Sequence, residues 1–310
     1  MAAIPDTVAY FNGNWVPRSQ VKIDLLDRGF YVGDAVFDIA RTFNGKSFKM
    51  REHVERLYRS LKHVRMDCGI SLDEMIDLSE ECVRKNEKFR KEVGDWHVWQ
   101  AVTRGIGGWR AEPGPPTVII QCVPVPFKTY AHLYKTGGHL VVAKSRSYSP
   151  EMLDPKVKHY SRLNFNLADL EAKDVDPEGW PVLLDQKGNL TEGTGYNVFI
   201  VTNGVIRTSG DSVLLQGVSR GAVFEVAEQL GIPYTQEELQ PYDLYTADEA
   251  FISNTPTCIL PMTKADNRVV GNGKPGPITQ QILAAWSEKV GLDIVDQAVR
   301  FAPKQTKVLS

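Results

Sequence analysis

A break rich in proline and glycine, between Pro124 and Gly138, divides this 310-residue chain into two stretches of regular pattern. The apolar periodicity lapses there, which is typical of a connection between folded units. A chain of this length also suits either one large unit or two modest domains. We therefore expect an N-terminal α/β domain over 1–125, an interdomain linker over 126–138 and a C-terminal domain over 139–310.

Apolar periodicity and turn residues predict both helices and strands in each stretch. Helices are predicted over 51–66, over 71–85 with Ser71 as N-cap and Glu74 completing a capping box, after Tyr160, after Gly217 and over 277–290. Strands are predicted over 8–11, 15–16, 97–103, 117–123, 140–143, 182–184, 198–201, 205–206, 213–215, 250–253 and 258–260. Asn12-Gly13-Asn14 and Asn203-Gly204 predict hairpin turns because both residue types accept a positive φ at little cost. This mixture predicts the α+β class, with mixed sheets and flanking helices.

The composition excludes several classes of protein. The 36 basic and 38 acidic side chains give a formal net charge of −2, which is unfavourable for binding nucleic acid. No run approaches the roughly 18–20 consecutive apolar residues of a membrane span, and the first residues lack the pattern of a secretory signal. The four cysteines are scattered without the spacing of metal ligands. We therefore expect a cytoplasmic protein with reduced thiols, no metal site and neither a membrane nor a nucleic acid as partner.

One segment, Gly217-Val218-Ser219-Arg220-Gly221, matches the G-x-S-x-G turn that carries the nucleophile of many hydrolases. Those hydrolases place their catalytic histidine after the serine, and none of the six histidines here follows Ser219, so we reject a hydrolase. A glycine turn that opens a helix leaves unpaired N–H groups at the positive end of the helix dipole. The segment is therefore either a phosphate seat or an ordinary helix N-terminus.

Six separated segments, in a fixed order along the chain, resemble the pyridoxal-phosphate (PLP) enzymes of fold type IV. They are Asp27-Arg28-Gly29-Phe30, Glu52-His53-Val54-Glu55-Arg56-Leu57, Lys158, Glu192-Gly193-Thr194-Gly195-Tyr196-Asn197, Gln216-Gly217-Val218-Ser219-Arg220 and Gly276-Pro277-Ile278-Thr279. This family, the class IV aminotransferases, includes branched-chain, D-amino acid and (R)-selective amine transaminases, and also aminodeoxychorismate lyase. The resemblance runs from Tyr10 to Leu283. It implies a two-domain fold like that of D-amino acid aminotransferase, with PLP bound by the C-terminal domain.

The resemblance also implies roles for individual residues. Lys158 matches the catalytic lysine that forms the Schiff base with PLP, whereas composition alone does not separate it from Lys156. Glu192 matches the carboxylate that pairs with the pyridine nitrogen. Arg56 matches the arginine that grips the phosphate. Further cofactor contacts are implied for Val218, Ser219 and Thr255.

The substrate site departs from the pattern of the branched-chain enzymes. Where those enzymes carry a tyrosine and an arginine for the substrate carboxylate, this chain has Val32 and Trp99. Pro256 lies in the turn that follows Thr255, and proline has no N–H to donate. The cation for the carboxylate of a 2-oxo acid is then Arg41, Arg104 or Arg110, among which the sequence does not choose. The substrate residues that we expect are Val32, Phe37, Arg41, Trp99, Arg110, Pro256 and Thr257.

Fewer carboxylate donors and a more apolar wall favour an amino donor without an α-carboxylate. We therefore expect an (R)-selective amine transaminase that exchanges an amino group between an amine and pyruvate or another 2-oxo acid. The alternatives are a branched-chain or D-amino acid aminotransferase, an aminodeoxychorismate-type PLP lyase and a non-catalytic binding protein. The resemblance further implies a homodimer in which each active site is shared between the subunits.

Overall fold

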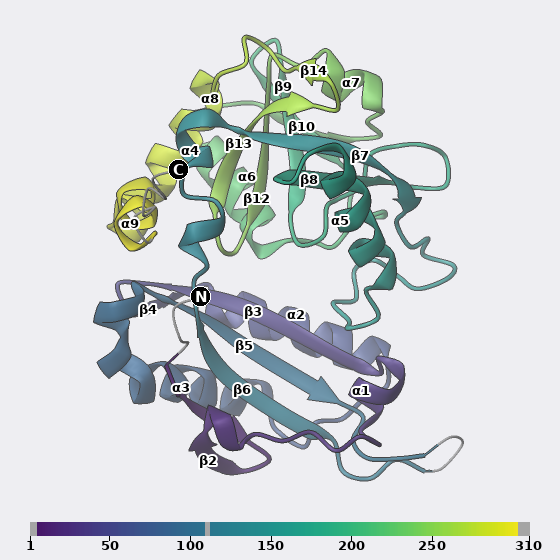
Figure 1. The fold of residues 1–310 in the computed structure, drawn as a ribbon, viewed down its shortest axis with the longest axis vertical. Helices are drawn as coiled ribbons and strands as arrows, with labels where there is room; N and C mark the ends of the chain where they lie inside the picture. The colour runs from purple at the N-terminus through teal and green to yellow at the C-terminus, as the bar shows by residue number, and fades with distance from the viewer. Residues whose placement is uncertain (1–4, 109–111, 303–310) are drawn as a thin grey trace, which may run out of the picture.

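The computed structural model describes residues 5–108 and 112–302 and contains two β-sheets, one in each half of the chain (Figure 1). The N-terminal sheet has six strands in the order β2-β1-β6-β5-β3-β4, and all its neighbouring strands are antiparallel. Its strands are β1 (Val8–Phe11), β2 (Asn14–Pro17), β3 (Ala35–Phe43), β4 (Lys46–Phe48), β5 (Trp96–Thr103) and β6 (Thr117–Pro124).

The C-terminal sheet is mixed. Its order is β11-β10-β9-β12-β13-β7-β8, with β14 paired to β13, and the pairs β7–β8, β7–β13 and β10–β11 are parallel. Its strands are β7 (Gly138–Arg146), β8 (Gly179–Leu184), β9 (Asn197–Thr202), β10 (Val205–Ser209), β11 (Tyr234–Glu237), β12 (Glu249–Asn254), β13 (Cys258–Ala265) and β14 (Arg268–Val269).

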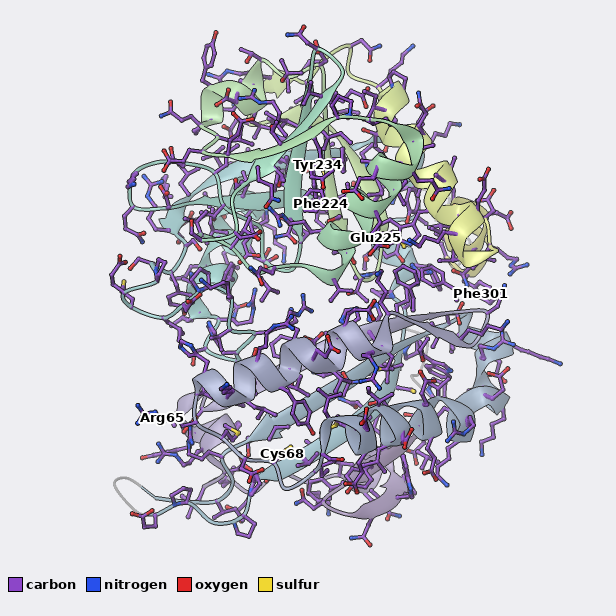
Figure 2. All side chains as sticks on the ribbon, turned by 180° about the vertical axis from the view of Figure 1, so that it is seen from behind. Arg65, Cys68, Phe224, Glu225, Tyr234 and Phe301 are labelled. Carbon is purple, nitrogen blue, oxygen red and sulfur yellow. The ribbon has the colours of Figure 1, made fainter. Side chains whose placement is uncertain are left out.

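Helices cover both sheets. Two long helices, α2 and α3, lie side by side on one face of the N-terminal sheet, as the view from behind shows (Figure 2). The helices are α1 (Arg28–Val32), α2 (Met50–His63), α3 (Leu72–Val93), α4 (Leu133–Thr136), α5 (Leu163–Val175), α6 (Val218–Leu230), α7 (Pro241–Tyr245), α8 (Pro277–Val290) and α9 (Ile294–Phe301). None of the described helices is long and apolar enough to cross a membrane.

Several predicted elements form where local chemistry specifies them. The Ser71 side chain accepts the N–H of Glu74 at 3.2 Å and starts α3, which continues to Val93, beyond the predicted end. Asn203 and Gly204 both have positive φ and join β9 to β10. The last long helix, α8, has its predicted bounds.

One predicted strand does not form, and the central strand β3 is among the elements that were not predicted. Residues 213–215 are not a strand: Leu214 is buried without sheet pairing. Conversely, β3 is a nine-residue strand that we did not predict. It carries the polar residues Asp38 and Arg41 at buried positions, and these interrupt the apolar pattern by which a central strand is recognised.

The connection between the sheets is itself packed. Phe127, Tyr130 and Tyr134 are buried in the same apolar cluster as the C-terminal sheet. The division at 126–138 stays a prediction, since this segment is part of a core as well as a crossing between the two halves. Across the junction, Lys49 donates to Glu225 at 2.6 Å, and Glu225 lies on α6 close to the N-terminal half (Figure 2).

Candidate active site

A pocket lies where the two halves of the chain meet. The residues that line it include all six that the resemblance assigns to the cofactor: Arg56, Lys158, Glu192, Val218, Ser219 and Thr255. They come from α2, from the loop before α5, from the segment between β8 and β9, from the start of α6 and from the turn after β12. Residues almost two hundred positions apart in sequence therefore share one cavity.

Lys158 belongs to the C-terminal half of the chain and is held by α2 and β3 of the N-terminal half. Its N–H donates to the Ser60 hydroxyl of α2 at 3.2 Å, and its carbonyl accepts the N–H of Phe37 at 3.0 Å. Burial, with the nearby cations Arg56 and Arg162, lowers the pKa of Lys158 to about 7. A large fraction of its side chain is therefore a neutral amine near neutral pH, which is the form that attacks a carbonyl carbon.

Glu192 is fixed beside the loop that precedes α6. Its Oε1 accepts the N–H of Leu215 at 3.1 Å, and its carbonyl accepts the N–H of Leu183 at 3.0 Å. Burial raises the pKa of Glu192 to about 7, while Arg162 and the Leu215 amide oppose that rise. This carboxyl can therefore exchange a proton or support a neighbouring cation at neutral pH.

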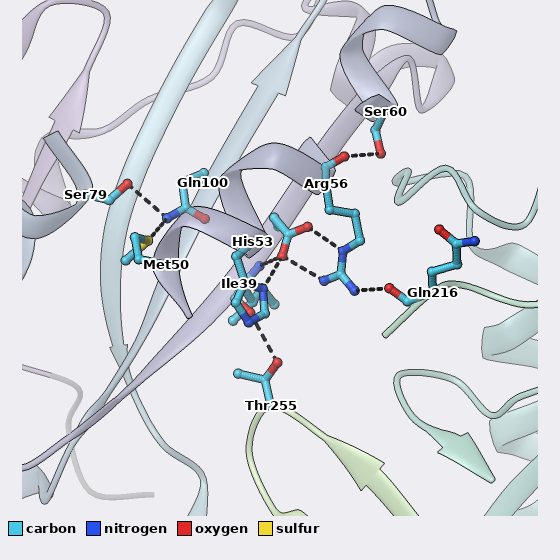
Figure 3. A network of polar contacts seen from close by, with 10 residues as sticks. Ile39, Met50, His53, Arg56, Ser60, Ser79, Gln100, Gln216 and Thr255 are labelled. Atoms are coloured by element: carbon cyan, nitrogen blue, oxygen red, sulfur yellow. Dashed lines mark hydrogen bonds and ion pairs between the residues drawn. The ribbon is translucent and has the colours of Figure 1, made fainter. Parts of the chain in front are cut away.

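Arg56 is oriented by a buried carboxylate. Its Nε and Nη2 each donate to Asp38 at 2.8 Å, its Nη1 donates to the Gln216 carbonyl at 3.1 Å, and His53 also contacts Asp38 (Figure 3). Although burial alone would raise it, Arg56 and His53 hold the pKa of Asp38 below its ordinary value. A guanidinium has five N–H donors, so about two remain for an anion in the pocket.

The start of α6 supplies further donors. Gly217 is its N-cap and has no side chain that could accept a hydrogen bond. The N–H groups of Val218 and Ser219, which line the pocket, therefore have no capping side chain as acceptor. A Cβ at Gly217 would lie 2.2 Å from Oδ1 of Asn197, and therefore only glycine fits this turn as it stands. The predicted phosphate seat lies beside Arg56, since the Gln216 carbonyl that precedes it is bonded to that arginine.

These residues fit PLP. The phosphate is a dianion, and it would meet Arg56, the N-terminus of α6 and the hydroxyl of Ser219. Ser253 also lines the pocket, and its buried hydroxyl has no hydrogen-bond partner among the described residues. A lysine with a lowered pKa and a carboxylate complete the set of groups that an aldehyde and a pyridine nitrogen require.

Three predicted substrate residues are aromatic or apolar. Phe37, Trp99 and the unpredicted Tyr160 form a cluster with ring centroids 4.6–6.5 Å apart. The Lys158 Nζ lies 4.7 Å from the centroid of the Phe37 ring, so this cluster adjoins the amine. Val32 is an exposed residue of α1, and neither it nor Phe37 or Trp99 is among the residues that line the pocket.

The structure contradicts the expectation that Arg41 binds a substrate carboxylate. Arg41 is 2% exposed; its Nη1 donates to the Pro256 carbonyl and its Nη2 to Gln297 at 2.6 Å. Its Cζ lies 4.3 Å from the centroid of the Phe43 ring. Burial and these contacts commit the guanidinium to joining β3, the turn after β12 and α9.

The other two arginines have different outcomes. Arg104 donates to Asp34 at 2.7 Å and to the carbonyls of Val64 and Arg65, all in the N-terminal half. Arg110 lies outside the described residues. Arg104 is therefore not among the described residues that line the pocket, and the role expected for Arg110 stays a prediction.

The turn after β12 uses its own donors. The Thr255 hydroxyl donates to the Ile39 carbonyl at 3.2 Å (Figure 3), and the N–H and hydroxyl of Thr257 both donate to Oδ1 of Asn254 at 2.7 Å. Pro256 has no N–H, and its carbonyl accepts from Arg41 and Tyr130. The donor groups of Thr257 that could hold a carboxylate are thus satisfied within the protein.

Sequence reasoning missed two charged residues of the site. Asp38 is fully buried and orients Arg56, although the sequence alone did not single it out. Arg162 lines the pocket four residues after Lys158. The position of Arg162, four residues after Lys158 and at the start of a predicted helix, could have indicated this role. Side chains in a helix point toward its N-terminus, and here the loop that carries Lys158 lies on that side.

Comparisons with known proteins agree with this geometry. The sequence model of the family "Amino-transferase class IV" matches residues 35–265. The chain is 34% identical to a putative branched-chain-amino-acid aminotransferase of Methanocaldococcus jannaschii over 295 residues, covering 93% of this chain and 99% of the relative. It is 28% identical to a D-alanine aminotransferase of Bacillus licheniformis over 282 residues, covering 90% and 96%.

A solved structure has the same fold. The branched-chain amino acid aminotransferase of Escherichia coli superposes with a TM-score of 0.85 at 28% identity, covering 93% of this chain and 94% of that one. The expected α+β architecture of fold type IV is therefore confirmed. By its sequence, its fold and the chemistry of its pocket, the chain belongs to the class IV aminotransferases, enzymes that use pyridoxal phosphate as cofactor.

Proposed function

We propose that this aminotransferase moves an amino group from a primary amine to a 2-oxo acid such as pyruvate, and that its preferred donors are (R)-amines without an α-carboxylate. The observation that carries the proposal is the turn of Thr255, Pro256 and Thr257. Pro256 has no N–H, and hydrogen bonds within the protein engage the Thr257 N–H and both threonine hydroxyls. A donor carboxylate at this turn would therefore lose its hydration without gaining hydrogen bonds in return.

The aromatic cluster supports the same proposal. Phe37 lies beside the Lys158 amine and stacks with Trp99 and Tyr160, and we propose that this cluster offers apolar surface to an aryl or alkyl group. An aromatic ring that covers apolar surface of the substrate removes this surface from water. The burial favours binding by roughly 25 cal/mol per Å² of apolar area. A hydrophobic amine gains from this wall, whereas a charged group does not.

The cofactor roles are part of the proposal. Arg56, the amides of Val218 and Ser219 and, through its backbone, Thr255 would hold the phosphate, and Glu192 would hold the proton of the pyridine nitrogen. When bound, PLP supplies an aldehyde carbon for the amine and a ring that withdraws electrons. We assign two roles to Lys158: its neutral Nζ would hold the cofactor aldehyde, and once the substrate amine has displaced it, the freed Nζ would take the proton from the substrate Cα.

We further infer a homodimer with shared active sites. Large apolar side chains are exposed in and before α1, in the loop before α5 and along α5, namely Leu25, Leu26, Phe30, Tyr31, Met152, Leu163, Leu167 and Leu170. Both helices lie on the same side of the molecule in Figure 1, and the Ser161 hydroxyl next to α5 donates to the carbonyl of Gly33 beyond α1 at 3.1 Å. Such a patch on one face favours a partner. Light scattering should give twice the 34.7 kDa chain mass, and Leu167→Asp should reduce it to one chain.

A cytoplasmic setting is the last part of the proposal. All four cysteines are free thiols, buried in the described structure. Reduced cysteines are typical of a reducing compartment. Fractionation of cells that express the untagged protein would test the assignment.

The decisive experiment compares amino donors. Initial rates are measured with (R)-1-phenylethylamine, its (S)-enantiomer, L-leucine and D-alanine, each with a saturating 2-oxo acid. The proposal expects the (R)-amine to react and its (S)-enantiomer to react at least ~100-fold more slowly, because one misplaced group in a fitted pocket costs about 3 kcal/mol. Activity on an amino acid with none on the (R)-amine would overturn it.

A second candidate is a branched-chain or D-amino acid aminotransferase. It is favoured by the relatives, which bear those names. The same rate comparison separates the candidates, since each predicts a different best donor. Release of pyruvate without an amino acceptor would instead indicate the lyase.

A further inference from the structure

Arg162 is a cation in the pocket that neither the family motifs nor the donor proposal accounts for. It precedes the first turn of α5 as its N-cap residue, four positions after Lys158. Its Nη2 donates to the Thr194 carbonyl at 2.7 Å, and its Cζ lies 4.0 Å from the centroid of the Phe165 ring. These two contacts fix the plane of the guanidinium against the wall of the pocket.

No side chain of the described residues forms an ion pair with the guanidinium. Among the residues that the structure describes, no carboxylate lies within ion-pair distance of Arg162, although Glu192 lines the same pocket. Only one of its five N–H donors has a partner among those residues. A partly buried cation with open donors is costly unless an anion completes it.

The charges of PLP show which anion is missing. In the proposed arrangement, Arg56 and the N-terminus of α6 would bind the phosphate, and Glu192 would pair with the protonated ring nitrogen. The ring oxygen at C3, which is ionised when the ring nitrogen is protonated, has no counter-ion among those groups. Arg162 stands on a different wall from Arg56: it is held by Thr194 and α5, whereas Arg56 is held by Asp38 of β3.

We propose that Arg162 is the counter-ion of the cofactor's C3 oxygen, and that through its charge it keeps Lys158 a neutral amine and Glu192 an anion. The proposal rests on the cofactor roles assigned above. One positive charge stabilises both required states, because it repels a proton from the lysine and also from the carboxyl.

The electrostatics of the two neighbours agree with this role. After burial and Arg56, Arg162 is the next cause that lowers the pKa of Lys158. For Glu192, burial raises the pKa and Arg162 is the strongest influence that lowers it. Removing the guanidinium should therefore move both groups toward their protonated forms.

The test is a spectroscopic pH titration of the PLP-loaded enzyme, which needs no amino donor. Arg162→Met keeps the length and apolar stem of the side chain, and Arg162→Lys keeps the charge without the planar fork. Lys173→Met is the matched control: it removes one positive charge from the exposed end of the same helix. We expect the pH midpoint of the cofactor's absorption change to rise by about one unit or more in Arg162→Met. The rise should be smaller in Arg162→Lys, and the control should match the native enzyme.

A second readout is the affinity of the apo-enzyme for PLP, measured by fluorescence titration. Loss of a charge-assisted hydrogen bond should weaken it about tenfold in Arg162→Met. If that variant does not fold, Arg162→Gln takes its place, with the thermal midpoint as the check of folding.

The outcomes separate this inference from the proposed function. A native enzyme that binds PLP, with an unchanged midpoint in the folded Arg162 variants, overturns the inference alone. An unchanged midpoint with a raised KM for the 2-oxo acid also overturns it, and makes Arg162 a ligand of the substrate carboxylate. A native enzyme that shows no cofactor band overturns the cofactor roles as well.

Discussion

Arg56 and Asp38 form a two-pronged ion pair in which Nε and Nη2 of the guanidinium each lie 2.8 Å from a carboxylate oxygen. Asp38 comes from β3 in the N-terminal sheet and is fully buried, while Arg56 reaches the loop before α6 through the Gln216 carbonyl. The predicted phosphate arginine is therefore oriented by the N-terminal half and presented to the C-terminal half. This relationship makes the orientation of the site depend on how the two halves pack.

We predict that Asp38→Asn weakens PLP binding by at least tenfold and destabilises the apo-enzyme. Removing one partner of a buried ion pair leaves an uncompensated charge, at a cost of about 3–5 kcal/mol. Equilibrium titration with PLP and thermal unfolding check both effects. The control is Asp73→Asn, which breaks an exposed pair with Arg51 and should change neither quantity.

Gly217→Ala should impair cofactor binding without unfolding the protein. A Cβ at this N-cap would lie 2.2 Å from Oδ1 of Asn197 and would displace the turn that presents the α6 amides. Gly221→Ala, one turn further along α6, has nothing within 4 Å of its added carbon. It should stabilise the enzyme by about 0.5–1 kcal/mol, because alanine is the better helix former. Equal PLP affinity in the two variants would contradict this account of the turn.

Arg41→Met should act on stability rather than on substrate binding. The substitution leaves the Gln297 amide oxygen and the Pro256 carbonyl without their buried donor, at a cost of about 1–3 kcal/mol for each group left unpaired. Denaturant unfolding measures that loss, and steady-state kinetics measure KM for pyruvate, which we expect to be unchanged. A large rise in KM at native stability would restore Arg41 as a carboxylate ligand.

Borohydride reduction of the PLP-loaded enzyme should attach the cofactor to Lys158. Lys158→Ala should abolish the attachment and reduce the transamination rate by at least ~1,000-fold, as expected when the nucleophile and proton carrier is lost. The matched control is Lys156→Ala, two residues away, where the native amine pairs with Asp154 at 3.2 Å. Peptide mapping that finds the adduct on another lysine would refute the assignment.

The capture of PLP by the apo-enzyme should depend on pH with a midpoint near that of the lysine. Burial and neighbouring cations lower the pKa of Lys158 to about 7 from its ordinary value of 10.5. Only the neutral amine attacks the aldehyde, so the rate should rise with pH through about 7 and then level off. Stopped-flow absorbance at constant ionic strength checks this. A rate that still climbs near pH 10 would indicate an ordinary, solvated lysine.

Short-range sequence patterns were sufficient for several local elements, and the ordered motifs predicted a set of cofactor residues that line one pocket. The Ser71 cap, the Asn203-Gly204 turn and α8 depend on residues within a few positions of one another, and their chemistry does not require the rest of the chain. The ordered motifs were also sufficient to select Lys158 and Glu192, which line one pocket with the other predicted cofactor residues.

The tertiary structure alone decided what each buried charge does. Arg41 contacts a carbonyl 215 positions away, and Asp38 and Arg56 meet only because β3 packs on α2. Residues 213–215 are apolar enough for a strand. However, the N–H of Leu215 donates to Glu192 and its carbonyl accepts from Asn197, so these groups are not available for a sheet. Local patterns encode the periodicity of a helix or strand, whereas the partner of a buried polar group depends on the path of the whole chain, because such a group must find its hydrogen bonds wherever the fold leaves it.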